Sequence, residues 1–284
     1  MKNITLIILS FLLISCYTGF SQEQIQIIMR GDDIGSSHAA NLGCIKSYQE
    51  GIMKSVEIMV PCAWFPEAVR MLNENPGLDV GVHVTLTSEW ENVKWRPLTH
   101  APGITDDDGY FYPMIWPSEN RPGLGSLKES DWTLEEIEAE MRAQIETALK
   151  HIPQVSHLSC HMGCSGWNDE VAALYQKLAR EYKLDIETSD YDVERIPLGP
   201  KASSSEERVN DFIEALDKLE PGKTYLYVEH PALKSMEMSA VGHQGYYGVN
   251  EDRQMVTELF TSKRLRKAIE EKGIRVISYA DLVR

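Results

Sequence analysis

The stretch Ile25-Gln26-Ile27-Ile28-Met29-Arg30-Gly31-Asp32-Asp33-Ile34 joins an apolar run to two adjacent carboxylates. The apolar part predicts a buried strand, in which successive side chains point to opposite faces. Asp32 and Asp33 therefore point in different directions, which allows one to bind a metal ion and the other to transfer protons. The alternative is that the two aspartates only cap a helix that starts near Ser36.

Short β-branched runs alternate with helical stretches along the rest of the chain. We expect strands at 25–30, 55–60, 78–86, 154–160, 183–187, 223–229 and 274–278. We expect helices at 38–50, 64–74, 133–150, 168–181, 206–219 and 251–271. This alternation is typical of an α/β fold with a parallel sheet, and about seven strands favour an incomplete, TIM-barrel-like (β/α) barrel in a single domain.

The composition is that of an ordinary globular protein, with 43% hydrophobic and 25% charged residues among 284. One large domain accounts for this length. The formal net charge is −15, and the chain has no block of basic residues. Both features argue against a nucleic-acid partner, because binding to phosphates requires clustered Lys and Arg.

Residues 1–21 have the pattern of an export signal, because Lys2 precedes an apolar stretch at 4–14 that is too short to span a bilayer. Two processing routes fit this segment. Leu13-Ile14-Ser15-Cys16 resembles a bacterial lipobox, which would anchor the protein to a membrane through a lipid on Cys16. Gly19-Phe20-Ser21 resembles an ordinary signal-peptidase site. Either route predicts an exported protein in the periplasm or at the cell surface, with its folded domain at 22–284.

Four cysteines remain after processing: Cys44, Cys62, Cys160 and Cys164. Their spacing is not that of a dense disulfide framework, so we expect structural thiols. The alternative is a zinc knot in which His157 and His161 join the last two cysteines. That knot would lack a second ligand pair at a zinc-finger spacing.

Three histidines lie at or just beyond predicted strands: His83, His161 and His230. Because the carboxyl ends of parallel strands meet at one edge of the sheet, these histidines are candidates to complete a site with the two aspartates. A lone histidine in an apolar strand is more often a hydrogen-bonded core residue, and this stays the alternative for His83. We expect His157 to lie deeper in the sheet, in a structural or supporting role.

Two long connections, 88–130 and 233–250, follow the strands that carry His83 and His230. Loops of this length usually have a function, and the loops after strand carboxyl ends build the active site in parallel α/β folds. We therefore expect both to surround one opening. Their aromatic rings suit sugar faces, although any one of them can simply pack the loops together. The candidates for substrate contact are Trp90, Trp95, Trp116 and Tyr246.

Four segments form a recognisable set: Arg30-Gly31-Asp32-Asp33-Ile34-Gly35-Ser36, residues 80–87, residues 156–161, and Val228-Glu229-His230-Pro231. Together they resemble the YdjC-like family of carbohydrate deacetylases, which includes chitooligosaccharide deacetylase. A similar stretch also covers Asn41 and residues 51–55. The resemblance spans nearly the whole chain after the signal.

This resemblance implies a deformed (β/α) barrel that removes an acetyl group from an N-acetylated amino sugar or oligosaccharide with one divalent metal ion. It implies Asp33, His83 and His161 as metal ligands, Asp32 as general base, and His230 as a candidate acid for the leaving amine. A metal suits this chemistry because it lowers the pKa of bound water and stabilises the tetrahedral oxyanion. Two imidazoles and one carboxylate suit Zn²⁺ or another first-row transition ion better than Ca²⁺, and Mg²⁺ with several waters stays open.

The chain departs from the family pattern around His161, where Ser159, Met162 and Gly163 replace the usual carboxylate and further histidines. Because supporting groups orient histidine ligands, this departure leaves two rival functions open. One is a glycoside hydrolase on the same barrel, with Asp32 and Glu229 as its two carboxylates. The other is a non-catalytic, sugar-binding surface lipoprotein.

Overall fold

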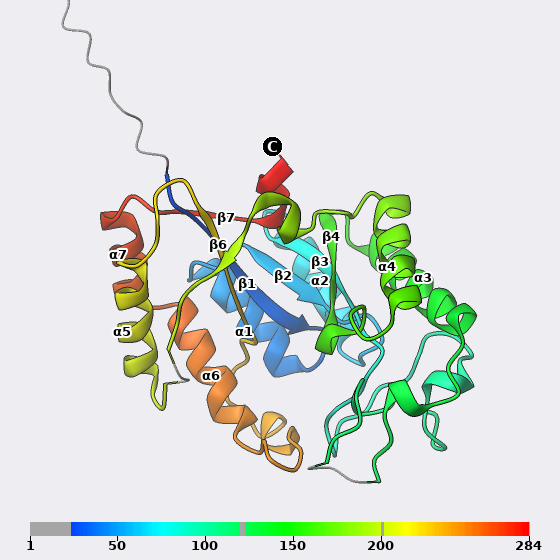
Figure 1. Cartoon of the computed structure of the whole chain (residues 1–284). Coiled ribbons are helices and arrows are strands. Elements are labelled where there is room, and N and C mark those ends of the chain that lie inside the picture. The colour runs from blue at the N-terminus through cyan, green and yellow to red at the C-terminus, as the bar shows by residue number, and fades with distance from the viewer. Residues whose placement is uncertain (1–23, 120–122, 200–201, 284) are drawn as a thin grey trace, which may run out of the picture.

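Seven parallel strands form one sheet with the stretch that contains Asp32 and Asp33 at its centre (Figure 1). The computed structural model describes residues 24–119, 123–199 and 202–283, so the predicted export signal and Cys16 lie outside the described residues. The strands are β1 (Gln26–Ile34), β2 (Ser55–Ile58), β3 (Asp79–Val84), β4 (Val155–Cys160), β5 (Glu194–Arg195), β6 (Thr224–Glu229) and β7 (Arg275–Ile277).

β1 is central because its apolar residues are buried on both faces, as parallel sheets require. Ile27, Ile28 and Met29 are fully buried. One edge of β1 pairs with β6, and the other pairs first with β7 and then, from Arg30 onward, with β2. The strand order is β4-β3-β2-β1-β6-β5, and within the described residues β4 does not pair with β5. The predicted α/β fold with an incomplete barrel is thus confirmed.

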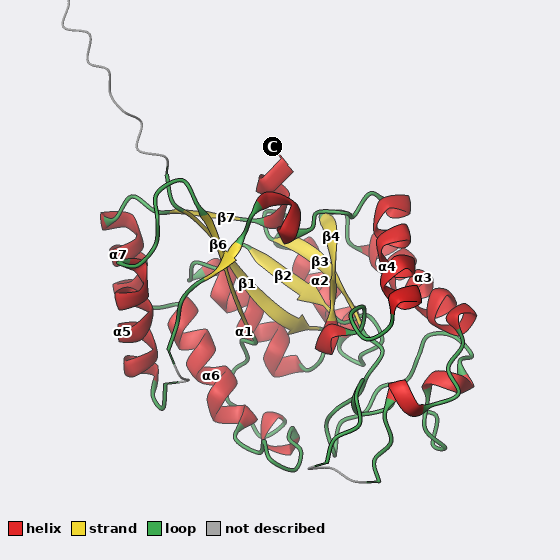
Figure 2. Cartoon of the chain, in the orientation of Figure 1, coloured by secondary structure: helices red, strands yellow, loops and turns green. Residues whose placement is uncertain are grey.

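Helices cover the sheet between successive strands (Figure 2). They are α1 (His38–Gln49), α2 (Phe65–Asn73), α3 (Leu134–His151), α4 (Asp169–Tyr182), α5 (Ser205–Leu216), α6 (Val249–Phe260) and α7 (Lys263–Glu271). Local chemistry explains where several begin. Thr133 and Glu136 form a capping box at the start of α3, and Asn168 caps α4. No helix in the described part of the chain is long and apolar enough to cross a membrane.

Two expected elements were wrong. Residues 183–187 do not form a strand, because Lys183 adopts a left-handed conformation (φ 59°) that ends α4. The segment's backbone hydrogen bond to β4 is a single one, from the Leu158 amide to the Leu184 carbonyl. The fifth strand is instead the two-residue β5. The single helix expected at 251–271 is two helices, because Ser262 caps a new one through its hydroxyl.

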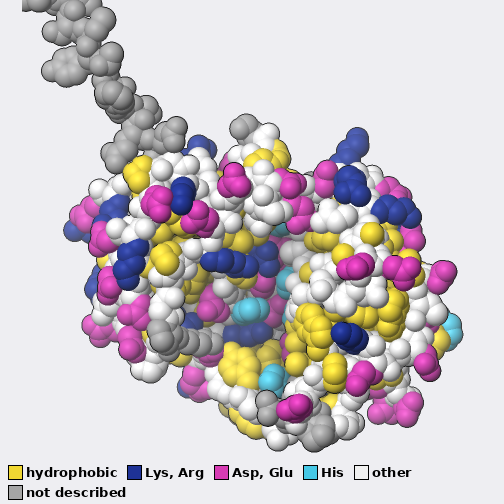
Figure 3. Space-filling view, viewed as in Figure 1, with side chains coloured by type: hydrophobic (Ala, Val, Ile, Leu, Met, Phe, Trp, Pro, Cys, Tyr) yellow, Lys and Arg dark blue, Asp and Glu magenta, His cyan; other side chains and the backbone are white. Residues whose placement is uncertain are grey.

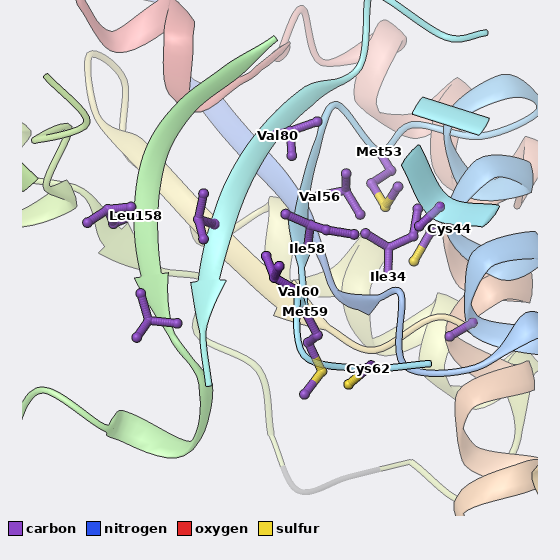
Figure 4. Close-up of a cluster of buried hydrophobic side chains, with 14 of the residues drawn as sticks. Ile34, Cys44, Met53, Val56, Ile58, Met59, Val60, Cys62, Val80 and Leu158 are labelled. Atoms are coloured by element: carbon purple, nitrogen blue, oxygen red, sulfur yellow. The ribbon is translucent and has the colours of Figure 1, made fainter. Parts of the chain in front are cut away.

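The main core lies between the sheet and the surrounding helices, and Figure 4 shows part of it, with side chains from the sheet and from α1. Ile34, Val56, Ile58 and Val80 from three neighbouring strands are fully buried there, beside Cys44 of α1. Burial of each such aliphatic side chain contributes roughly 1.5–3 kcal/mol. Cys44, Cys62, Cys160 and Cys164 are all free thiols, as expected.

The two long connections meet at the carboxyl ends of the strands. In Figure 1 the arrowheads of β1 and β2 point toward the lower half of the view, where the loops gather. The backbone amide of Glu91 donates to the Gly242 carbonyl (3.0 Å), and the amide of Gln244 donates to the Glu91 carboxylate (2.8 Å). As expected, both loops therefore surround one opening.

Glu140 of α3 fixes the first of these loops. Its fully buried carboxylate accepts hydrogen bonds from the amides of Leu98 and Thr99, the Thr99 hydroxyl and the Gln144 side chain. Gln144 in turn bonds both the amide and the carbonyl of Thr85, directly after β3. One buried acidic residue thus holds the loop against the helix.

We expect Glu140→Ala to lower the free energy of unfolding by roughly 2–4 kcal/mol, because buried amide donors lose their acceptor. Urea unfolding measures the loss, and amide hydrogen exchange at Leu98 and Thr99 should accelerate with it. Glu135→Ala, at an exposed position on the same helix, is the matched control. Equal unfolding midpoints for the two variants would contradict this role for Glu140.

Candidate active site

The end of β1 is irregular, and this irregularity presents the two aspartates. The pairing with β2 shifts register between Gly31 and Ile34, and Asp33 has a positive φ of 72°. Such a conformation is uncommon for a residue other than glycine and is often found at functional sites. Ser37 caps α1 by accepting the amide of Ala40 (3.0 Å). The aspartates are therefore not the helix caps.

The carboxylate of Asp33 is buried, and among the described residues only one of its two oxygens has a hydrogen-bond partner. Its Oδ2 accepts a hydrogen bond from Nη2 of Arg253 on α6 (2.8 Å). Its Oδ1 is buried and has no hydrogen-bond partner among the described residues. Burial opposes ionisation, but the charges of His230 and Arg253 outweigh it and hold the pKa of Asp33 well below its usual range. An ionised oxygen without a donor is a strong indication of a cation ligand.

Two histidines face this oxygen. His83 Nε2 lies 3.7 Å and His161 Nδ1 lies 3.5 Å from Asp33 Oδ1. One donor atom from each of the three residues lies within 4.8 Å of the others, and all three side chains are buried. The rings of His83 and His161 meet edge to face with centroids 5.3 Å apart. The structure thus brings together all three predicted metal ligands.

His83 is oriented by a chain of polar groups behind it. Its Nδ1 lies 2.7 Å from the Ser159 hydroxyl, which donates to Glu57 of β2. Because that hydroxyl proton is directed to the carboxylate, Ser159 accepts from Nδ1–H, and Nε2 keeps its lone pair toward Asp33. Burial also lowers the pKa of His83 to about 4, so the ring is neutral. Position 159 has no carboxylate, but Ser159 connects His83 to the carboxylate of Glu57.

Glu57 is held in turn by cations deeper in the sheet. Its Oε1 lies 2.8 Å from His157 Nε2 and 3.4 Å from Arg30 Nε. Burial opposes ionisation of Glu57, but these two neighbours outweigh it and lower its pKa. His157 also stacks on Tyr279 with centroids 4.0 Å apart. It has the supporting role expected for it.

His161 has its own carboxylate partner. Its Nε2 lies 3.0 Å from Glu89, which follows β3 and is buried. Burial opposes protonation, but Glu89 and Asp33 outweigh it and raise the pKa of His161 to about 10. One nitrogen of His161 contacts the Glu89 carboxylate, and one nitrogen of His83 contacts Ser159, which is bonded to the Glu57 carboxylate. The other nitrogen of each ring faces Asp33. This is the usual arrangement of histidine metal ligands.

The donor set fits a divalent cation of the first transition row. It offers one carboxylate oxygen and two imidazole nitrogens, and three protein ligands leave coordination positions open. The alternative zinc knot does not form among the described residues, since the Asp33 cluster is the one group of three or more donors that converges there. Cys164 instead donates to the Val84 carbonyl.

Asp32 lies beside the cluster on a rigid support. Arg30 donates to both of its oxygens, from Nε at 2.6 Å and from Nη2 at 2.8 Å. Burial opposes ionisation, but Arg30 outweighs it and lowers the pKa of Asp32. Asp32 Oδ2 is also 3.7 Å from His83 Nε2. The side chain is an ionised carboxylate in a fixed position next to the proposed metal ligands.

His230 stands on the other side of Asp33 and reaches the surface. Its Nε2 lies 3.9 Å from Asp33 Oδ2, and its side chain is 39% exposed. Burial of the ring opposes protonation, but the Asp33 carboxylate outweighs it and raises the pKa of His230. The site therefore pairs an ionised carboxylate, Asp32, with an imidazole on the solvent side whose protonated form is favoured by Asp33.

These groups open into a cavity of about 340 Å³. Its walls include Asp33, His161, His230, Trp90 and Tyr246. Figure 3 shows histidine and basic atoms together in the hollow at the middle of this face. A cavity of this volume can hold a sugar ring beside Asp33.

The four aromatic candidates occupy different places. Trp90 lines the cavity, stacked on His243 with centroids 5.5 Å apart, and Tyr246 lines it with its hydroxyl on Asp252. Trp116 is 45% exposed and lies close to Gly163 at the turn after β4. Trp95 is only 4% exposed, and its indole nitrogen donates to the Thr87 carbonyl. The first two therefore remain the best placed for substrate.

Four supporting residues were missed in the sequence: Arg30, Glu57, Glu89 and Arg253. Glu57 had a usable signal, since a charged residue inside the apolar segment Val56-Glu57-Ile58 must find a buried partner. Arg30 lies two positions before Asp32 and was equally visible. Arg253 carried no local signal, because its approach to Asp33 depends on how α6 packs against β1.

The chain is similar to known proteins over most of its length. A family model described as "YdjC-like protein" matches residues 26–271. The carbohydrate deacetylase of Listeria monocytogenes serotype 4a (strain HCC23) is 28% identical, with 91% of this chain and all of that protein covered. The carbohydrate deacetylase of Enterococcus faecalis (strain ATCC 700802 / V583) is 26% identical, covering 90% of this chain and 98% of the relative.

Among solved structures, a protein from Enterococcus faecalis V583, provisionally described as a cellobiose-phosphate cleavage protein, superposes with a TM-score of 0.70. It is 26% identical, and the superposition covers 91% of this chain and 99% of that one. The similarity therefore extends over the whole described fold.

We expect Ser159→Ala to weaken binding of Zn²⁺ about 10- to 100-fold, because His83 loses the group that directs its lone pair. Titration against a competing chelator measures the affinity. Ser159→Asp should restore it, since a carboxylate then contacts His83 directly. Ser156→Ala is the control on the same strand, where the hydroxyl serves Asp79 and His157. Wild-type affinity in Ser159→Ala would contradict the proposed orientation.

Metal affinity should also rise with pH. Without metal His161 stays protonated up to about pH 10, whereas His83 is neutral above about pH 4. Binding must therefore release one proton from His161, and the apparent Kd for Zn²⁺ should fall about tenfold per pH unit between pH 6 and 9. Glu89→Gln removes the charge that raises this pKa and should flatten the dependence. An affinity that is flat in the wild type argues against His161 as a ligand.

Proposed function

The chain belongs to the YdjC-like protein family, and on that premise we propose that it is a metal-dependent carbohydrate deacetylase. It removes the acetyl group from an N-acetylated amino sugar or oligosaccharide. The observation that carries this proposal is the buried Asp33 Oδ1, which has no donor and is faced by the two histidines. The carbohydrate deacetylases that resemble it along most of its length support the reaction class.

Asp33, His83 and His161 are the residues that would hold the divalent cation. Bound there, a cation such as Zn²⁺ supplies a lowered pKa for the attacking water and stabilises negative charge on the amide oxygen. The protein's own task is to hold the three ligands in place. Glu57 with Ser159 and Glu89 do this from behind the histidines.

Asp32 acts as the general base. Its carboxylate is ionised and fixed by Arg30, so it is ready to accept a proton from the attacking water without moving. A carboxylate held within hydrogen-bond reach of the nucleophile contributes about 10²–10⁴-fold to such a reaction. The low pKa favours the ionised form over the whole neutral range.

His230 acts as the general acid. An amine leaves an amide only if its nitrogen is protonated, and His230 is the protonated group on the open side of Asp33. Trp90 and Tyr246 then offer aromatic faces for the sugar ring at the cavity wall. Base and acid thus approach the scissile amide from different sides.

The rival functions have weaker support in the site. A glycoside hydrolase requires one carboxyl group that stays protonated to serve the leaving oxygen, and the Arg30 contacts give Asp32 the opposite character. The non-catalytic alternative rested on the departures at Ser159, Met162 and Gly163. For the first of these, Glu57 supplies a carboxylate through the Ser159 hydroxyl. Acetate release decides among the three.

Export is also part of the proposal, with the protein in the periplasm or at the cell surface. Its support is the sequence at 1–21 alone. Mass spectrometry of the mature amino terminus separates the two processing routes. A lipid-modified Cys16 indicates membrane anchoring, an amino terminus at Gln22 indicates a released protein, and an intact Met1 argues against export.

The reaction itself is tested with N-acetylated chitooligosaccharides and the purified mature protein. We expect acetate release without new reducing ends, and loss of activity in chelator followed by recovery when Zn²⁺ is added. New reducing ends that persist in chelator would identify a glycoside hydrolase. Sugar binding with neither product, across oligosaccharides of different length and acetylation, would identify a binding protein.

Two variants separate the proposed roles. Asp32→Asn should lower kcat at least about 10²-fold and leave the bound metal in place, because the base is lost and the ligands are not. His83→Ala should lose both activity and metal. Acetate release and metal content are measured on the same preparations. Metal retained by His83→Ala would contradict the ligand assignment.

A further inference from the structure

The last segment of the chain crosses beneath the candidate site, at the amino ends of the strands. β7 pairs with residues 26–28 of β1, and a short 3₁₀ helix (Tyr279–Val283) follows it. The backbone amide of Tyr279 donates to the Ser55 hydroxyl and to Asp79 Oδ2, both at 3.1 Å, where β2 and β3 begin. Figure 1 shows this short helix at the end of the sheet opposite the two long loops. The segment therefore connects three neighbouring strands from the side away from the cavity.

Tyr279 points from this segment into the interior of the incomplete barrel. Only 3% of the residue is exposed, and it packs with buried aliphatic side chains from three strands: Ile28, Leu226 and Ile277. Its ring stacks flat on His157 of β4. Since alternate residues of a strand share a face, Arg30 and Asp32 follow Ile28 on the same side of β1. The tyrosine thus lies at the base of the row of side chains that ends in Asp32.

Arg30 connects the tyrosine to Asp32. Its Nε and Nη2 donate to the two carboxylate oxygens of Asp32, and its third nitrogen, Nη1, donates to the Tyr279 hydroxyl at 2.9 Å. A guanidinium is planar and presents its donors in fixed directions. Because the Tyr279 hydroxyl holds the nitrogen that Asp32 does not use, it fixes the direction of the two donors that Asp32 does use.

A second carboxylate competes for Arg30. Glu57 Oε1 lies 3.4 Å from Arg30 Nε. Removal of the Tyr279 hydroxyl would leave Nη1 without its acceptor, and a rotation of the guanidinium toward Glu57 would then satisfy that nitrogen at the expense of Asp32. The Tyr279 hydroxyl therefore determines how the arginine is shared between the two carboxylates.

The Tyr279 hydroxyl is suited to this task because it stays neutral. Burial raises the pKa of Tyr279 to about 12, although the charge of Arg30 opposes the shift. A tyrosinate would attract the guanidinium more strongly and weaken its contact with Asp32. A neutral hydroxyl accepts one hydrogen bond and leaves the positive charge to the carboxylates.

We propose that Tyr279 is a positioning residue for the general base: its hydroxyl fixes Arg30, and Arg30 fixes the carboxylate of Asp32. The inference rests on the proposed function and deepens it, because it makes the carboxyl-terminal segment a support of the reacting groups. Tyr279 lies behind the base and acts on the reaction only through Arg30.

Tyr279→Phe tests this, because it removes the hydroxyl and keeps the ring on His157. We expect kcat for acetate release from N-acetylated chitooligosaccharides to fall about tenfold, since a misplacement of about 1 Å can cost roughly 10²-fold. KM and bound Zn²⁺ should not change. Tyr225→Phe is the matched control, because Tyr225 is also 3% exposed and its hydroxyl accepts the backbone amide of Glu220 (3.0 Å) at the start of β6.

The same two variants in an Asp32→Asn background separate positioning from a structural role. If Tyr279 acts through the base, Tyr279→Phe should leave the residual kcat of Asp32→Asn unchanged. A loss of similar size in both backgrounds would overturn the proposal. So would an unchanged kcat in the single variant, or an equal loss in Tyr225→Phe.

A crystal structure of Tyr279→Phe gives a readout that does not depend on activity. We expect Arg30 to lose one of its hydrogen bonds to Asp32 and to approach Glu57, and a pair unchanged from the wild type would overturn the proposal. If the pair changes but the wild-type protein releases no acetate, the deacetylase function fails and the role of Tyr279 in holding Asp32 stands. If acetate is released and the pair is unchanged, only the role of Tyr279 fails.

Discussion

The arrangement of the candidate site depends on one carboxylate oxygen of Asp33. Asp33 Oδ1 is buried and ionised, and it has no hydrogen-bond partner among the described residues. The backbone places it there through a left-handed residue at the end of the central strand. A buried charge of this kind is costly unless it is compensated, and Arg253 compensates only the other oxygen. The remaining oxygen, with two imidazole nitrogens directed at it, makes the end of β1 a candidate cation site.

The two histidines owe their direction to carboxylates behind them. His161 contacts Glu89 directly, whereas His83 reaches Glu57 through the Ser159 hydroxyl. Glu57 lies on β2, whereas Ser159 lies on β4. The carboxylate that the family resemblance implies at position 159 is therefore supplied here from another strand. The two carboxylate oxygens of Glu57 also connect β2 to His157 and Ser159 of β4. Site geometry and sheet stability therefore depend on the same buried polar groups, and a change at Glu57 affects both.

Periodicity was sufficient to predict most strands and the helices before α6. Asp33, His83 and His161 were identified through the resemblance and the order of strand ends, and they converge as that order requires. The failures have local causes that periodicity does not encode. Lys183 turns left-handed and prevents a strand, and Ser262 starts a new helix. Arg253 acts on Asp33 from 220 positions away, a contact set by helix packing alone.

Anomalous diffraction from crystals soaked in Zn²⁺ tests the central claim most directly. Data collected on both sides of the zinc absorption edge locate the ion without reference to activity. We expect one strong peak about 2 Å from Asp33 Oδ1, His83 Nε2 and His161 Nδ1. A peak at the thiols of Cys160 and Cys164, or no peak within reach of Asp33 under conditions in which the protein releases acetate, would contradict this claim.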